Sequence, residues 1–130
     1  MTPAPIQQWH AYLETLDAAA LKDLLAEDVV FESPVVHTPQ AGRTITMKYL
    51  LGAAAVLNNE HFHYEHEWFS PTGAVLEFVT EIDGIKINGV DIIHWNEAGE
   101  ITRFKVMVRP LKAINLLHQK MGAMLASMAS

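Results

Sequence analysis

The sequence predicts an α+β domain in which helices come first, an antiparallel sheet follows and a further helix comes last. Apolar residues recur at helical spacing in the first third of the chain and again after Pro110. Between about residue 60 and residue 109 they instead alternate with polar residues, which is the period of a half-buried strand. A chain of 130 residues suits one domain, so we expect residues 1–130 to form a single unit.

The N-terminal third is expected to contain three helices and one short strand. Residues 9–16 carry apolar side chains at i, i+3, i+4 and i+7, and Asp17 can cap a second short helix. The β-branched and aromatic run 29–31 indicates a strand, which ends before Pro34. Residues 42–58 return to helical spacing and predict a third helix.

Four strands and a C-terminal helix are expected in the rest of the chain. Asp83-Gly84 is a strong two-residue hairpin signal, because both residues tolerate the positive φ of a type I′ turn. Residues 96–100 suit a slightly longer hairpin loop, and Pro110 ends the last strand and begins the C-terminal helix. The expected strands are 61–69, 74–82, 85–95 and 101–109.

Composition and charge argue against several functional classes. The formal net charge of −6 disfavours nucleic acid as a partner, and no apolar run reaches the ~20 residues that cross a membrane. The chain has no cysteine and no basic, apolar leader at its start, which fits a cytoplasmic protein. It contains no Gly-rich phosphate loop, Walker motif or nucleophile elbow, so no cofactor is expected.

Two stretches carry a resemblance to a known family. Residues 25–34, LAEDVVFESP, followed by Gly42-Arg43, are similar to the helix-to-strand junction of the nuclear transport factor 2-like superfamily, which includes ketosteroid isomerase and the SnoaL-like polyketide cyclases. Residues 89–101, GVDIIHWNEAGEI, resemble the penultimate hairpin of that superfamily. The resemblance covers nearly the whole chain. It implies a cystatin-like fold, in which N-terminal helices wrap a cone-shaped, curved antiparallel sheet around an apolar pocket, here with an extra C-terminal helix.

Within this superfamily the nearest motif match is to ketosteroid isomerase, which holds an oxyanion with a tyrosine and a protonated aspartic acid. The resemblance places Tyr12 on that tyrosine, through a shared Tyr-x-Glu-x-x-Asp pattern, and Asp91 on that aspartic acid. The isomerase's base is the aspartate of a Glu-Asp-Pro triplet, where this chain has Ser33. Because a serine cannot carry a proton between carbons near neutral pH, the nearby His37 is the candidate replacement base.

Each of these residues also has a structural interpretation. Asp91 lies in an apolar strand, where desolvation would raise its pKa and favour the neutral acid, a hydrogen-bond donor. Alternatively, Asp91 is a structural acid bonded to a side chain of the first helix or to a backbone amide. Tyr12 can be a core tyrosine with a satisfied hydroxyl, and His37 can be a partly solvated loop residue.

Strand periodicity predicts the walls of the pocket. If Asp91 faces inward, alternate residues on its strand and its neighbours do so too, and Val90, Ile92 and His94 form a far face that is largely apolar. In this superfamily such a face is commonly covered by a second copy of the sheet, so we expect a homodimer. The predicted ligand-binding residues are Ser33, Leu76, Phe78, Ile93, Trp95, Phe104, Val106 and Val108.

A metal site is the weaker of two interpretations of the strand 61–69. His61, His63, Glu65 and Glu67 alternate in the sequence and could chelate a metal from one face of the strand. An alternating polar set is also typical of a solvent-facing strand, so no metal is expected.

Two functional hypotheses remain. The first is a domain that binds a small hydrophobic ligand, or an isomerase, cyclase or hydrolase acting on a carbonyl-bearing steroid-like or polyketide-like compound, with Tyr12 and Asp91 as polar anchors. The second is a non-catalytic binding or dimerisation module whose pocket is filled by side chains. An open cavity lined by the two anchors would favour the first hypothesis, and a collapsed core the second.

Overall fold

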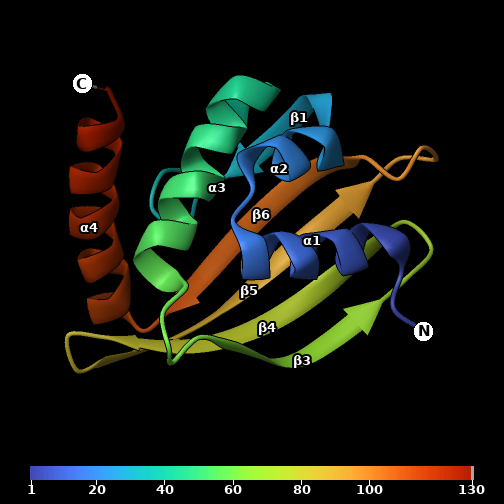
Figure 1. The fold of residues 1–130 in the computed structure, drawn as a ribbon. Helices are drawn as coiled ribbons and strands as arrows, with labels where there is room; N and C mark the ends of the chain where they lie inside the picture. Colours follow the sequence, from blue (N-terminus) through green and yellow to red (C-terminus); the bar gives the residue numbers. More distant parts are fainter. Residues whose placement is uncertain (130) are drawn as a thin grey trace.

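The computed structural model describes residues 1–129 and confirms the expected α+β order (Figure 1). Within these residues there are four helices and six strands, in the order two helices, two strands, one helix, four strands and one helix. The helices are α1 (Ala4–Thr15), α2 (Ala18–Leu24), α3 (Arg43–Leu57) and α4 (Leu111–Ala129). The strands are β1 (Leu25–Glu32), β2 (Gln40–Ala41), β3 (His63–Phe69), β4 (Gly73–Ile82), β5 (Ile85–Trp95) and β6 (Ile101–Arg109).

The six strands form one curved sheet in the order β2-β1-β6-β5-β4-β3. Neighbouring strands are antiparallel except β1 and β6, which run parallel with Phe31 opposite Phe104. The sheet is therefore mixed, where a purely antiparallel sheet was expected. The parallel pair forms because β1 and β6 are joined by a long connection through α3 and the β3–β5 meander, not by a hairpin.

Turn chemistry places the element boundaries. Asp83 and Gly84 have positive φ values of 52° and 77° between β4 and β5, as a type I′ hairpin requires. Gly99 has a φ of 80° in the loop between β5 and β6. Asp17 caps α2 by accepting a hydrogen bond from the backbone amide of Ala19 at 3.0 Å.

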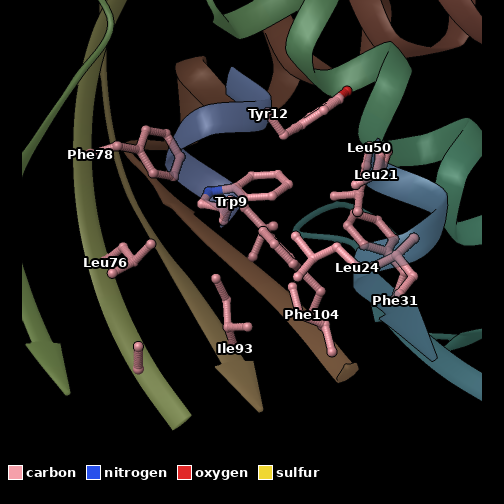
Figure 2. Close-up of a cluster of buried hydrophobic side chains, with 14 of the residues drawn as sticks. Trp9, Tyr12, Leu21, Leu24, Phe31, Leu50, Leu76, Phe78, Ile93 and Phe104 are labelled. Carbon is pink, nitrogen blue, oxygen red and sulfur yellow. The ribbon is translucent and has the colours of Figure 1, made fainter. Parts of the chain in front are cut away.

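The hydrophobic core lies between α1, α2, α3 and the face of the sheet that these helices cover, which we call the inner face (Figures 1 and 2). The indole ring of Trp9 packs against Phe104 with ring centroids 4.9 Å apart. Leu76 and Ile93 project from β4 and β5 into the same cluster and are fully buried. This core fixes α1 on the sheet and so positions the side chains of the site.

Helix α4 packs beside α3 (Figure 1). A methyl group built on Gly52 of α3 would lie 3.4 Å from Met121 Cε and 3.5 Å from Met124 Cγ, so methionine side chains fill this contact. Lys120 also reaches Asp83 in the β4–β5 turn at 3.1 Å. Within residues 1–129, no helix combines the length and apolar character needed to cross a membrane.

Candidate ligand cavity

A cavity of about 260 Å³ lies between the inner face of the sheet and helices α3 and α4. Most of its lining is apolar and comes from α1, β1, α3, the inner face of β3–β6, and α4. Asp91 is the one carboxylate among the described lining residues, and none of them is a lysine or an arginine. The cavity is therefore an apolar site with a single acidic group.

Seven aromatic side chains, here called the aromatic belt, line this cavity. Ring centroids of neighbours within the belt are 4.9 to 6.3 Å apart, and the rings form two contiguous groups. A hydrogen bond between Trp9 and Tyr64 joins the two groups. The belt consists of Trp9, Phe31, Tyr49, Phe62, Tyr64, Phe78 and Phe104.

Two hydrogen bonds in series end at Asp91. Trp9 Nε1 donates to the Tyr64 hydroxyl oxygen at 2.8 Å, and that hydroxyl donates to Asp91 Oδ2 at 2.5 Å. An indole N–H can only donate, so the Tyr64 oxygen accepts this bond and its own proton goes to Asp91. No described residue hydrogen-bonds Asp91 Oδ1. A proton on Asp91 therefore sits on Oδ1, in a residue that borders the cavity.

Burial sets the charge of this pair. Asp91 is only 6% exposed, and burial raises its pKa to about 7, against a smaller opposing effect of the Tyr64 hydrogen bond. Burial, followed by the charge of Asp91, raises the pKa of Tyr64 well above its ordinary value. Tyr64 thus remains a donor across the neutral range, and Asp91 is the member of the pair that changes charge.

A second polar pair lies next to Tyr64 and ties α1 to β3. His10 Nε2 is 2.7 Å from Glu67 Oε2, and the His10 ring lies edge-on to Tyr64 with centroids 5.5 Å apart. The charge of Glu67 also contributes to the raised pKa of Tyr64. This contact holds the first helix where Trp9 can reach the Tyr64 hydroxyl.

Tyr12 does not converge with Asp91 as expected. It is buried in the core and absent from the cavity lining, and its hydroxyl has no hydrogen-bond partner among the described residues. Figure 2 shows this hydroxyl directed toward α3. Trp9, one helical turn earlier, occupies the position facing the sheet, and Tyr64 from β3 donates to Asp91.

The loop after β1 holds the two residues proposed near the missing base. His37 is exposed and does not line the cavity. Ser33 does line it, but its hydroxyl oxygen already accepts hydrogen bonds from the backbone amides of Val35 at 3.0 Å and Val36 at 3.4 Å. Ser33 therefore lines the cavity together with Pro34, Val35 and Val36 of the same loop, whereas His37 does not.

The predicted walls divide into two sets. Phe78, Phe104 and Val106 line the cavity together with Ser33. The other four predicted residues lie on the inner face, as alternation predicts, but outside the lining. The reason is that the inner face is longer than the cavity. Helix α1 and the core cluster cover the remaining length, and Trp95 turns away to donate its indole N–H to the Pro71 carbonyl. These four residues are Leu76, Ile93, Trp95 and Val108.

Helix α4 supplies part of the lining that the strand pattern could not predict. Leu117, His118, Met121, Gly122 and Leu125 face the cavity from this helix. His118 is otherwise exposed and makes no ion pair or hydrogen bond with the described residues. The C-terminal helix thus forms one wall of the site.

Among the described residues, one group of side chains of the kinds that bind metals lies on the opposite face of the sheet. Glu65, His66 and Glu77 bring their ligand atoms within 4.8 Å of one another, and His66 Nδ1 is 3.1 Å from Glu77 Oε1. A bulge between Tyr64 and His66 changes the alternation of β3. The four residues His61, His63, Glu65 and Glu67 therefore do not share one face of the strand, as their spacing in the sequence suggested. Asn88 also donates to Glu77, so protein groups already satisfy this carboxylate.

Known proteins with similar sequences and structures agree with this architecture. The model of the SnoaL-like domain family matches residues 6–104. A steroid delta-isomerase from Pseudomonas aeruginosa is 34% identical, with a TM-score of 0.90 over 98% of this chain and 93% of that one. An uncharacterised protein with a cystatin-like fold from Silicibacter pomeroyi is 30% identical, with a TM-score of 0.85 over 92% and 84%.

A more distant similarity concerns the fold alone. A protein with a ketosteroid isomerase-like fold from Catenulispora acidiphila, solved in complex with trimethylamine, is 18% identical, with a TM-score of 0.65 over 88% of this chain and 91% of that one. No curated protein sequence matches the chain. The family match and the shared fold together establish that this chain belongs to the SnoaL-like domain family, with a nuclear transport factor 2-like fold.

Proposed function

We propose that this protein binds a small hydrophobic molecule with a carbonyl oxygen, and that Asp91 is the polar anchor for that oxygen. The position of Asp91 at a largely apolar cavity carries the proposal, since none of the described residues hydrogen-bonds its Oδ1. A protonated Asp91 would donate from Oδ1 to the carbonyl while Tyr64 holds Oδ2. The open cavity also argues against a module whose pocket is filled by side chains.

The volume of the cavity limits the ligand. Sites for drug-sized ligands typically enclose ~300–1,000 Å³. At about 260 Å³, this cavity favours a molecule of one or two rings over a complete steroid. The aromatic belt offers ring faces and edges to such a flat ligand.

The site also suits proton transfer on an enolisable ketone. A hydrogen bond from protonated Asp91 would stabilise the oxyanion that forms when a proton leaves the carbon next to the carbonyl. The similarity to a steroid delta-isomerase supports isomerisation as the reaction class, with cyclisation and hydrolysis as the family's alternatives. His37 as the base stays a prediction, and Tyr12 as a second anchor does too. An unchanged rate in His37→Ala would remove His37 from the reaction.

Binding of 2-tetralone, a neutral two-ring ketone, tests the proposal. Trp9 lines the cavity, so quenching of its fluorescence should report binding. We expect the tightest binding at acid pH and weaker binding as Asp91 ionises through a pKa of about 7. In Asp91→Asn a donor remains without a titration, so the pH dependence should disappear. The proposal would be contradicted if the affinity of the parent for 2-tetralone did not change with pH, or if Asp91→Asn kept the pH dependence of the parent.

The location of the ligand can be tested with Gly122. This residue lines the cavity, and a methyl group built on it would meet nothing within 4 Å, so a longer side chain has room to enter the site. We expect Gly122→Leu to abolish 2-tetralone binding without loss of stability, since leucine also favours a helix over glycine. Ala123→Leu, at an exposed neighbour outside the lining, is the matched control and should bind as the parent does.

We also propose that two copies pair through the outer face of the sheet. Trp68 and Met107 are 56% and 50% exposed there, beside the half-buried Val90 and Ile92. Such a patch is typical of an interface in a protein of this size. Sedimentation should give a dimer for the parent and a monomer for Ile92→Glu, and a parent that is monomeric at all concentrations would refute this pairing.

A further inference from the structure

The charge and aromatic content of the cavity point to a second class of ligand. Asp91 is the one carboxylate in the described lining, and no lysine or arginine accompanies it. The aromatic belt surrounds the same space. We propose that the cavity binds hydrophobic ammonium ions, with the cationic head against the rings of the belt and Asp91 as its counter-ion. This inference rests on the proposed function in that both use the same cavity.

The belt provides the contacts that a quaternary ammonium ion can use. Such an ion has no N–H to donate, so it binds through its charge and its methyl groups. The faces of aromatic rings carry partial negative charge and attract cations most strongly where water is excluded. Phe62 contacts Tyr64 with centroids 5.3 Å apart, and Tyr64 bonds directly to Asp91. The ring of Phe62, the phenol of Tyr64 and the carboxylate of Asp91 are therefore successive contacting groups in the lining.

Among residues 1–129, no lysine, arginine or histidine pairs with Asp91. Its neighbours across the sheet are Leu76 on β4 and Val106 on β6, which are apolar. Tyr64, its one hydrogen-bond partner in the described part of the chain, is a neutral donor. An ionised carboxylate in these surroundings is costly unless it is paired, and a bound cation would supply the missing partner.

The other charged groups near the cavity are already engaged or lie at its rim. Lys120 of α4 pairs with Asp83 at 3.1 Å, and His10 of α1 lies 2.7 Å from Glu67 of β3. His118 of α4 is the one imidazole in the described lining and is exposed. Because His118 is the imidazole nearest a bound ligand, its contribution to any pH dependence needs its own variant.

The two ligand classes require opposite charge states of Asp91. A ketone accepts a hydrogen bond from the neutral acid, whereas an ammonium ion pairs with the carboxylate. Burial raises the pKa of Asp91 to about 7, so pH separates the two modes of binding. A quaternary ammonium ion keeps its charge at every pH, which leaves the protein as the titrating partner.

The experiment compares benzyltrimethylammonium with neopentylbenzene, its neutral isostere, by quenching of tryptophan fluorescence, to which the cavity residue Trp9 contributes. We expect the parent to prefer the ammonium ion by roughly tenfold at about pH 8. Its affinity for that ion should rise roughly tenfold between about pH 6 and about pH 8, as the ionised fraction of Asp91 rises. His118→Gln should keep this rise. Asp91→Asn should lose both the rise and the preference.

Glu97→Gln is the matched control, because it removes one exposed carboxylate from the loop that follows the strand of Asp91. It should behave as the parent does, and thermal unfolding should show that every variant is folded. Suppose that 2-tetralone binds, but the parent does not prefer the ammonium ion or its affinity for that ion does not rise with pH. In that case, or if Asp91→Asn keeps both the preference and the rise, the ammonium inference is overturned and the proposed function stands. If 2-tetralone, the ion and its isostere all fail to bind, both are overturned.

Discussion

The wall of the cavity formed by α1 and the sheet differs in kind from the wall formed by α3 and α4. On the sheet side, Trp9, Tyr64 and Asp91 are joined by short hydrogen bonds within a close-packed core. On the helix side, Gly52 meets the flexible ends of methionines, and Gly122 faces open space. The first wall holds the hydrogen-bonding groups around Asp91 in fixed positions, and the second can adapt to the shape of a ligand.

The glycines of the two walls show the same difference. A methyl group built on Gly89 of β5 would overlap the ring of Phe78 and lie 2.7 Å from the Met107 carbonyl oxygen, a backbone atom that cannot move aside. One built on Gly52 would lie 3.4 Å from the mobile end of Met121. Mutations should therefore cost stability on the sheet side and change ligand size on the helix side.

The largest expected effect is on the pH dependence of stability in Asp91→Asn. The native pKa of Asp91 is raised from 3.8 to about 7, so the native state holds a proton that the unfolded state releases. The free energy of unfolding of the parent should therefore fall from about pH 4 to about pH 7 and level off above, by up to about 4 kcal/mol. Urea unfolding of both proteins should show Asp91→Asn more stable by this amount at about pH 8 and similar at about pH 4. If the parent and Asp91→Asn were equally stable at both pH values, the carboxyl of Asp91 would be solvated rather than buried.

Alanine at the two glycines gives the next largest contrast. Gly89→Ala should lower the free energy of unfolding by about 1–3 kcal/mol, because the added methyl overlaps atoms that cannot yield. Gly52→Ala should be neutral or slightly stabilising, since helix formation favours alanine and the methionines can shift. Thermal unfolding measures both. A large loss in Gly52→Ala would show that the helix wall is as rigid as the sheet wall.

The two tyrosines provide a third contrast, no larger than that of the glycines. Tyr64→Phe removes a hydroxyl that joins Trp9 to Asp91 and leaves the Trp9 N–H without its acceptor, at an expected cost of about 1–3 kcal/mol. Tyr12→Phe removes a buried hydroxyl with no partner in the described structure, so it should be neutral or stabilising. Chemical unfolding gives the free energy of unfolding of both variants and shows which hydroxyl contributes more to stability. A greater loss of stability in Tyr12→Phe would contradict this account, because it would show that the Tyr12 hydroxyl has a stabilising partner.

The spacing of apolar residues and the residues at turns predicted most of the fold, because each strand and helix carries its own pattern of apolar residues. The parallel pairing of β1 with β6 could not be predicted in this way, since pairing depends on how distant segments pack. Asp91 was predicted because a carboxylate in an apolar strand is an exception within a regular pattern.

Tyr64 was missed because histidines and glutamates surround it in the sequence and suggest a solvent-facing strand. A bulge just after Tyr64 shifts the alternation, and alternation alone cannot reveal a bulge. Trp9 and Tyr12 share one helix face, so helical spacing could not tell which of them meets the sheet. That choice depends on the tilt of α1 against Phe104 and β3.

The most direct test of Asp91 as the anchor of the cavity is a titration of its carboxyl carbon by ¹³C NMR, with and without ligand. The free protein should give a pKa of about 7 for Asp91. Bound 2-tetralone should raise this pKa, because it accepts a hydrogen bond only from the neutral acid, and benzyltrimethylammonium should lower it. An ordinary pKa near that of a solvated aspartate, or a pKa that neither ligand moves, would contradict the account.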